Sequence, residues 1–155
     1  MHLPEIICLN DFGGHYASYI EAVYEIFTND FILDKPSFRG TRLGLKKHPI
    51  VDGKEYTFYH FTHSGEIEDD RIPDLERCER IGWIKPMINN SDSKDLLVWR
   101  KPHGSKHRIL IYHPSERFLV VLDDRGDYIL PWTAYCVKYN NRHRKLIAES
   151  EKYSI

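Results

Sequence analysis

The last third of the chain constrains the fold most, because successive β-like runs are joined there by short turns. Residues 107–113 and 118–123 are rich in apolar residues, and the turn Asp124-Arg125-Gly126 leads into residues 128–135. Short runs of this kind bounded by turn residues are typical of antiparallel strands. We expect strands at residues 96–100, 107–113, 118–123 and 127 to about 139, and Pro131 predicts an edge or a bulge in the last strand.

Upstream of this meander, the pattern predicts a helix and one further strand. Apolar residues recur at helical spacing over about residues 14–29, which predicts a helix that packs on the sheet. Residues 56–62 are aromatic and β-branched, so they predict the first core strand, with Phe58, His60 and Thr62 on one face.

Two more helices complete the expected elements. Pro73 suits the first turn of a short middle helix that ends at Pro86, and Asn140 or Asn141 can cap a terminal helix. Residues 30–53 are interrupted by Gly and Pro and predict an irregular connection with one short strand. We expect a single α+β domain of residues 1–155, with a small antiparallel sheet of about five strands, an N-terminal helix, a middle helix and a C-terminal helix.

Composition and charge limit the class of protein. The 155 residues carry a formal charge of −1, so any attraction to nucleic acid must be local. Residues 66–79 are acidic and residues 142–145 are basic, which permits a basic face, although charge runs are also common on solvated surfaces. Three cysteines without a C-x-x-C pair disfavour a disulfide framework or a zinc site and favour a cytoplasmic protein. With no leader and no apolar run of spanning length, no membrane association is expected.

Several common sites are absent from the sequence. It contains no G-x-x-x-x-G-K-[ST], G-x-G-x-x-G or G-x-S-x-G motif, which disfavours the commonest nucleotide, dinucleotide and serine-hydrolase sites. His103 and His107 have a spacing that would suggest a metal on a helix, but Pro102 and Gly104 argue against that helix. We expect no metal and no cofactor.

Histidine and hydroxyl side chains on the expected strands suggest proton chemistry on a phosphodiester. Metal-free cleavage of RNA by its own 2′-hydroxyl needs a base, an acid and cations around the phosphorus. His60 suits the proton transfer, although a lone strand histidine is as often a hydrogen-bonded core residue. Thr133 and Tyr135 share one face of the last strand and can contact one phosphate, while Trp132 and Ala134 face the core; Tyr135 is equally typical of a half-buried sheet position.

Arginines supply the expected phosphate contacts. Arg77 and Arg80 lie three apart on the middle helix, where guanidinium groups can bind one anion or form salt bridges with neighbouring acids. Arg108 can reach an open face of the sheet or cover an edge. The expected substrate-binding residues are Arg108 together with three residues of the basic run, Arg142, Arg144 and Lys145, which are otherwise ordinary exposed helix charges.

Three segments resemble a known family. Residues 58–65 (FYHFTHSG), 73–80 (PDLERCER) and 130–135 (LPWTAY), followed by the basic run, are similar to short bacterial and prophage-associated proteins near the barnase, EndoU, colicin and RelE-like (BECR) nuclease fold. The resemblance spans roughly residues 56–150.

The resemblance implies a metal-independent endoribonuclease of the toxin type, often held by a cognate antitoxin or immunity protein. It implies RNA as the substrate and a site on the open face of a small antiparallel sheet. Carried residue by residue, the strand histidine falls on His60, the hydroxyl pair on Thr133 and Tyr135, and the helix arginines on Arg77 and Arg80.

Two alternatives remain at this point. Tyr59-His60-Phe61-Thr62 also resembles the Tyr-His-x-Thr strand of ADP-ribosyltransferases, but that enzyme requires a glutamate on a late strand, where the chain offers only Glu116 in a turn and Asp127. A non-catalytic, phage-related binding or inhibitor module would instead explain the ten tyrosines, because tyrosine is favoured at protein interfaces.

Overall fold

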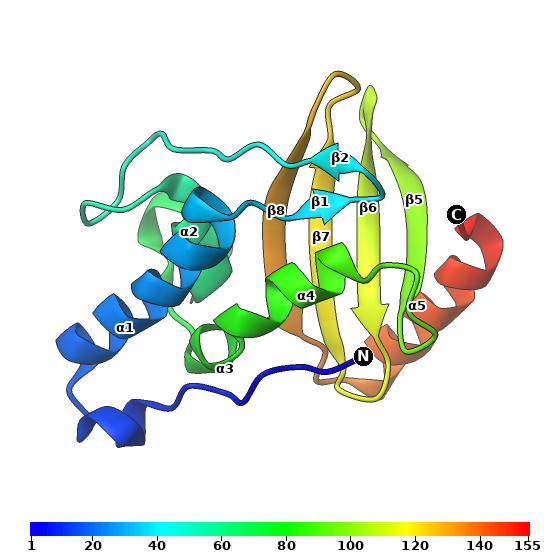
Figure 1. Cartoon of the computed structure of the whole chain (residues 1–155). Helices are drawn as coiled ribbons and strands as arrows, with labels where there is room; N and C mark the ends of the chain where they lie inside the picture. The colour runs from blue at the N-terminus through cyan, green and yellow to red at the C-terminus, as the bar shows by residue number, and fades with distance from the viewer.

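A four-stranded antiparallel sheet lies at the centre of the fold, in a computed structural model that describes all 155 residues. Its strands pair in sequence order: β5 (Leu97–His103), β6 (Lys106–His113), β7 (Phe118–Asp124) and β8 (Ile129–Cys136). Figure 1 shows them as a meander with β5 and β8 at the edges. The expected meander and the α+β class are confirmed, whereas the expectation of about five strands is wrong.

The two faces of the sheet belong to two separate apolar clusters. On the face that we call the major face, Ile109, Ile111, Val120 and Leu122 join the larger cluster. On the opposite face, which we call the α5 face, the alternate residues Leu110, Tyr112, Leu119 and Val121 join a smaller cluster that also contains Leu146. The strands are therefore apolar on both sides, which explains why residues 118–122 form a continuous apolar run rather than an alternating one.

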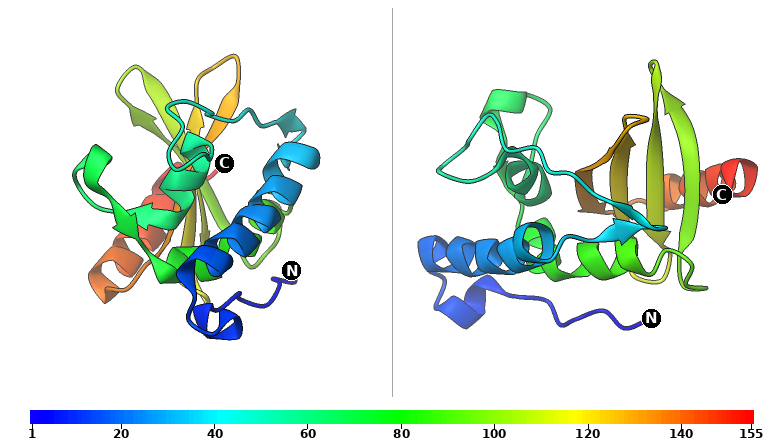
Figure 2. Two further views of the ribbon diagram at one scale, coloured as in Figure 1. Left: turned by 90° about the vertical axis from the view of Figure 1, so that its left-hand side faces the viewer. Right: turned by 45° about the horizontal axis from the view of Figure 1, so that its top comes forward.

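The helices are distributed unequally over these faces. The five α-helices are α1 (Tyr16–Thr28), α2 (Tyr56–Thr62), α3 (Leu75–Glu79), α4 (Ile84–Asn89) and α5 (Asn140–Tyr153). Figures 1 and 2 show α4 on one side of the sheet and α5 on the other, with α1 and α2 grouped beyond β8. None of these helices has the length and apolar composition needed to cross a bilayer.

Minor elements connect the larger ones. Two short hairpins are formed by β1 (Ser37–Phe38) with β2 (Thr41–Arg42), and by β3 (His63–Ser64) with β4 (Ile72–Pro73). Short 3-10 helices occur at Leu9–Phe12, Glu68–Asp70 and Ile81–Trp83, and a π-helical turn spans Asn29–Leu33. Residues 30–53 are largely irregular, as the sequence indicates, although they contain two short strands rather than one.

Helix α1 confirms the expectation of a helix over about residues 14–29. Tyr19, Val23 and Phe27 recur every four residues and are all fully buried. This spacing places them on one stripe of the helix, which packs into the larger cluster.

Residues 56–62 form helix α2, so the expectation of a core strand there is wrong. All seven residues are buried, and a short segment that is buried all round has no alternation by which a strand could be distinguished from a helix. The start of the helix is stabilised from outside, because the main-chain N–H groups of Tyr56 and Thr57 donate to the carbonyls of Lys47 and Lys46 at 3.1 and 3.0 Å. Aromatic β propensity is a weak preference that this environment overrides.

The middle and terminal helices differ from expectation in detail. Pro73 lies in β4, and Asp74 instead caps α3 by accepting a hydrogen bond from the main chain of Arg77. Pro86 lies inside the first turn of α4, where its missing N–H costs nothing, and therefore does not end the helical region. Helix α5 begins at Asn140 after Tyr139, with no side-chain cap.

Candidate functional site

A β-bulge in β8 positions the side chains of the candidate site. Val121 pairs with Thr133 but Leu122 pairs with Pro131, so Trp132 is the extra residue on β8. Trp132 consequently packs with Tyr135 against the α5-face cluster, although regular alternation predicted that it faces the core opposite Thr133. The expectation of a bulge or edge at Pro131 is confirmed, while the expected direction of Trp132 is wrong.

Arg77 of α3 connects α2 to β8 at this bulge. Its Nη1 donates to the main-chain oxygen of His60 at 3.0 Å and to Oγ1 of Thr133 at 3.1 Å. Its Nε lies 3.5 Å from Oδ2 of Asp74, and its Cζ lies 5.5 Å from the centre of the Tyr135 ring. Burial lowers the pKa of Arg77, but a guanidinium stays charged in proteins, so Arg77 places a cation beside Thr133 and Tyr135.

Arg142, in the first turn of α5, brings a second guanidinium to Tyr135. Its Nη2 donates to the hydroxyl oxygen of Tyr135 at 3.1 Å. With its oxygen engaged as an acceptor, the phenol keeps its own proton free to donate elsewhere.

Arg108 of β6 supplies a third cation on the same face. Its Cζ lies 4.9 Å from the centre of the Trp132 ring, and its buried Nε has no hydrogen-bond partner. Burial lowers the pKa of Arg108, while the nearby Asp123 carboxylate favours the charged form. Arg108 therefore places a third cation beside the bulge, stacked on the Trp132 ring.

The imidazole of His60 lies in a separate buried cluster. His60 is 2% exposed, and its ring lies between the rings of Tyr56 and Trp132, at 4.7 and 4.9 Å between centres. Its Nε2 and the Tyr56 hydroxyl both contact Oε1 of Glu68. Only the main-chain oxygen of His60 reaches Arg77 and Thr133, so the imidazole contributes to the site through Trp132.

The ionisation of this cluster follows from burial and pairing. Burial lowers the pKa of His60 below its ordinary value, although Glu68 favours the charged form. Burial alone would raise the pKa of Glu68, but the hydrogen bonds from Tyr56 and His60 lower it overall. At neutral pH the pair is therefore an uncharged imidazole that donates to a carboxylate.

Three expected site residues lie apart from this group. Arg80 donates to the Glu76 carbonyl and to Glu79, both at 3.1 Å, and lies over Trp83 rather than beside Arg77. Arg144 and Lys145 are exposed on α5, and Arg144 bonds within its own helix.

Two neighbours of His60, Glu68 and Trp132, were not predicted from the sequence as part of the site. Glu68 stands in an acidic run typical of exposed surface, and only the β3–β4 hairpin returns it to α2. Trp132 had a usable signal, because Pro131 predicted the bulge that turns it toward His60.

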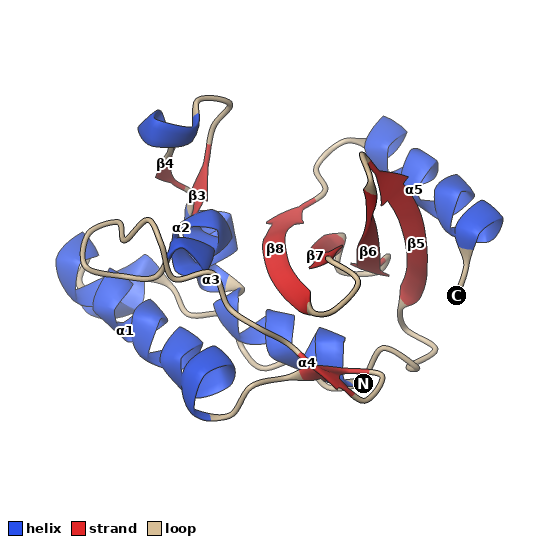
Figure 3. Cartoon of the chain, turned by 90° about the horizontal axis from the view of Figure 1, so that it is seen from above, coloured by secondary structure: helices blue, strands red, loops and turns tan.

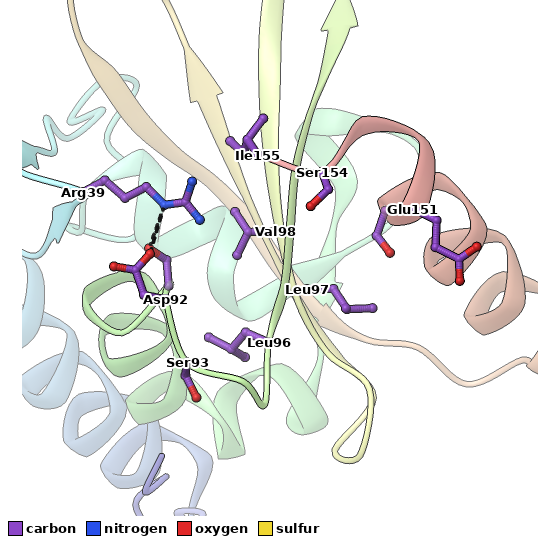
Figure 4. Close-up of a pocket in the computed structure, with 11 residues that line it drawn as sticks. Arg39, Asp92, Ser93, Leu96, Leu97, Val98, Glu151, Ser154 and Ile155 are labelled. Carbon is purple, nitrogen blue, oxygen red and sulfur yellow. Dashed lines mark hydrogen bonds and ion pairs between the residues drawn. The ribbon is translucent and has the colours of Figure 1, made fainter.

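A separate open pocket of about 410 Å³ lies at the other edge of the sheet, beside β5. Figure 4 shows Arg39 and Asp92 paired at its rim, with Val98, Ser154 and Ile155 nearby. No residue of the β8 group lines this pocket.

Comparison with known proteins adds no family to these observations. No protein-family model matches the chain, and neither curated proteins nor solved structures give a match. No three His, Cys, Asp or Glu side chains lie together in a way that could hold a metal ion. Fold and site define an α+β protein with a sheet face that carries several guanidinium groups around Trp132, Thr133 and Tyr135.

Proposed function

We propose that the protein is an endoribonuclease that binds an RNA phosphodiester on the α5 face of β8. The observation that carries this proposal is the convergence of Arg77, Arg108 and Arg142 on the side chains of one bulged strand. Of these three guanidinium groups, only that of Arg77 forms an ion pair, with the carboxylate of Asp74. This excess of positive charge is half-buried beside hydroxyl groups. It suits a phosphate, because one guanidinium group can donate two parallel hydrogen bonds to two phosphate oxygens.

The proposed reaction is transfer of the phosphorus from the 5′ oxygen of one nucleotide to the neighbouring 2′ oxygen. The 2′ oxygen attacks phosphorus, its proton passes to water, and the bond between phosphorus and the 5′ oxygen breaks. Tyr135 gives its proton to the leaving 5′ oxygen and regains one from solvent, while Arg108 and Arg142 stabilise the charge that develops on the phosphorane. The products are a 2′,3′-cyclic phosphate and a 5′-hydroxyl.

His60 has a different role in this proposal from the one that the sequence suggested. Its imidazole is buried against Glu68 and Trp132, so it acts as a positioning residue that fixes the Trp132 ring under Arg108. If His60 were the general base, His60→Gln would remove a titration below pH 6.5 from the pH profile of kcat/KM. A lower rate with an unchanged profile is the expected result.

The direct test is RNA cleavage in the presence of a chelator. Purified protein is incubated with single-stranded and structured RNA, and the ends are mapped for 2′,3′-cyclic phosphate. Tyr135→Phe should lower kcat about 100- to 10,000-fold, the range for losing a general acid, while Arg144→Gln should leave the rate unchanged. Substituting deoxyribose at the cleaved position should abolish the reaction. Absence of cleavage by the wild type, or an equal rate in Tyr135→Phe, would contradict the proposal.

A non-catalytic binding module is the second candidate function, and the exposed apolar residues of one segment favour it. Ile67 and Ile72 are each 67% exposed on the β3–β4 hairpin, and Leu75 follows at 42%. Figure 3 shows this hairpin projecting beyond α2. In a toxin, a cognate antitoxin would cover such a surface. A tight stoichiometric complex of a protein without any turnover of RNA would favour the binding module over the nuclease.

The structure does not favour the ADP-ribosyltransferase alternative. It required Tyr59, His60 and Thr62 on a strand, whereas these residues lie in α2. A cytoplasmic site of action and a bacterial or prophage origin belong to the nuclease proposal. The same end-mapping assay on total RNA, after expression of the protein in bacteria, tests whether the protein cleaves RNA in the cytoplasm.

A further inference from the structure

A second basic feature lies at the start of β8. A pocket of about 410 Å³ opens between residues 45–48 and the turn that precedes β8. Its walls carry the cationic side chains Lys46, Lys47 and Arg125, together with His48 and Tyr128, and none of its seven lining residues is acidic.

The segment of residues 44–47, which carries the lining residues Leu45, Lys46 and Lys47, is held on both sides by main-chain hydrogen bonds. The N–H of Gly44 donates to the carbonyl of Ile129 on β8 at 2.8 Å. The carbonyls of Lys46 and Lys47 accept from the first N–H groups of α2. The segment thus bridges β8 and α2, so the pocket exists before any ligand binds and little ordering accompanies binding.

The charges around the pocket favour an anion. The Lys46 ammonium lies 4.9 Å from the centre of the Tyr56 ring and forms no ion pair, while Arg125 is paired with Asp123 at 2.7 Å. Lys106 adds another cation, because its ammonium donates to the main-chain oxygen of Arg125 at 3.4 Å. Asp127 lies in the same turn but does not line the pocket.

Tyr128 adds an aromatic surface to this cationic pocket. Its side chain is 48% exposed, unlike most of the large apolar side chains of the sheet. An exposed ring between cations is the arrangement with which proteins stack an unpaired base while holding the adjoining phosphates.

Two series of contacts connect the pocket to the proposed cleavage site. On one side Arg125 pairs with Asp123, which lies opposite Arg108 in the β6–β7 register. On the other side the rings of Tyr56, His60 and Trp132 follow one another from Lys46 to Arg108. The pocket and the site are therefore neighbours along β8, separated by only a few residues of strand, each about 3.3 Å long.

We propose that this pocket binds a nucleotide of a single-stranded RNA that lies beyond the two nucleotides joined by the scissile phosphate. Its base stacks on Tyr128, and Lys46, Lys47 and Arg125 hold its phosphate. A base within a duplex is not free to stack on a side chain, so the pocket selects unpaired RNA. The inference rests on the proposed function for the class of its ligand.

The test uses binding, so that it does not depend on cleavage. Fluorescent 2′-O-methyl RNA, which lacks the attacking hydroxyl, is titrated in lengths from a dinucleotide to about eight nucleotides. Tyr128→Ala should weaken binding of the longest oligonucleotide about 5- to 150-fold and leave the dinucleotide unaffected, whereas Tyr128→Phe should bind as the wild type does. Lys47→Gln should weaken binding. It should also reduce the slope of log K against log salt concentration by about 1, as expected for the loss of one phosphate contact.

Matched variants outside the pocket separate specific from general effects. Tyr153→Ala removes another exposed aromatic ring, and Lys94→Gln removes another exposed cation. Both should bind RNA as the wild type does. Equal weakening in these variants, or unchanged binding in Tyr128→Ala and Lys47→Gln, overturns the inference.

Failure of the inference is distinguishable from failure of the proposed function. If the wild type cleaves RNA while the pocket variants bind normally, the pocket is overturned and the nuclease stands. If the pocket variants lose binding while the wild type never cleaves, the nuclease is overturned and the pocket stands as an RNA-binding site. A duplex bound as tightly as the single strand would overturn the selection for unpaired RNA.

Discussion

Replacing Arg77 with Met should destabilise the protein, because the Arg77 side chain of α3 hydrogen-bonds to both α2 and β8. The change removes the bonds to the His60 carbonyl at 3.0 Å and to Thr133 at 3.1 Å, and the weaker pairing with Asp74 at 3.5 Å. Hydrogen bonds to a charged group contribute about 1.5–3 kcal/mol each. Part of that gain offsets the cost of burying the cation, so the expected net loss is about 2–4 kcal/mol in the free energy of unfolding.

The assay is urea denaturation followed by tryptophan fluorescence, with thermal unfolding as a second measure. For a chain of this size the loss corresponds to a decrease in Tm of roughly 4–16 °C. Arg77→Lys should recover little of it, because an ammonium cannot reproduce the planar fork that contacts both acceptors. Arg144→Met, which removes an exposed guanidinium, should leave the midpoint unchanged. A free energy of unfolding for Arg77→Met within about 1 kcal/mol of the wild type would show that these contacts are not stabilising.

Three further outcomes are expected. The free energy of unfolding should fall as pH drops through about 6.5 toward the lower folded pKa of His60, because the unfolded chain then binds a proton that the buried imidazole does not. His60→Gln should reduce this dependence of stability on pH, and His63, whose pKa is also lowered, should retain a part of it. An unchanged pH dependence of the variant in urea titrations would be the opposing result. Burial raises the pKa of the Cys78 thiol to about 12, so Cys78 should resist a thiol reagent at pH 8 until the protein unfolds, and mass spectrometry showing early labelling of this residue would disagree. Phe61→Ala should lower the free energy of unfolding by about 3–5 kcal/mol, because the Phe61 ring is fully buried against Phe31. A decrease below about 1 kcal/mol in a denaturation experiment would be inconsistent with that packing.

The meander could be read from the sequence because each of its signals is local. The apolar runs, the turn at Asp124-Arg125-Gly126 and the proline in the last strand act over a few residues. Strands β6 and β7 begin and end within one residue of the expected bounds, while β5 and β8 each end about three residues away from them. Helix α1 was equally accessible, because a 13-residue helix with one apolar stripe contains several turns of its period.

The candidate site was only partly accessible from sequence. Thr133, Tyr135, Arg77, Arg108 and Arg142 were expected from residue type. The structure places Arg77 against Thr133 and Tyr135, Arg142 against Tyr135, and Arg108 against Trp132. Their relative placement depends on a bulge whose position the sequence does not specify and on an arginine that crosses from one helix to a strand 56 residues later. Such distant contacts leave no periodic trace in the chain.

The sequence by itself determined an α+β protein with a C-terminal antiparallel meander, a long first helix and a basic start to the last helix. Only the tertiary structure decided that residues 56–62 are helical and that His60 is enclosed by Trp132 and Glu68. The physical reason is that strand pairing and amphipathic stripes repeat within one element. A short segment buried on every side takes its conformation from its neighbours, here the carbonyls of Lys46 and Lys47, which lie elsewhere in the chain.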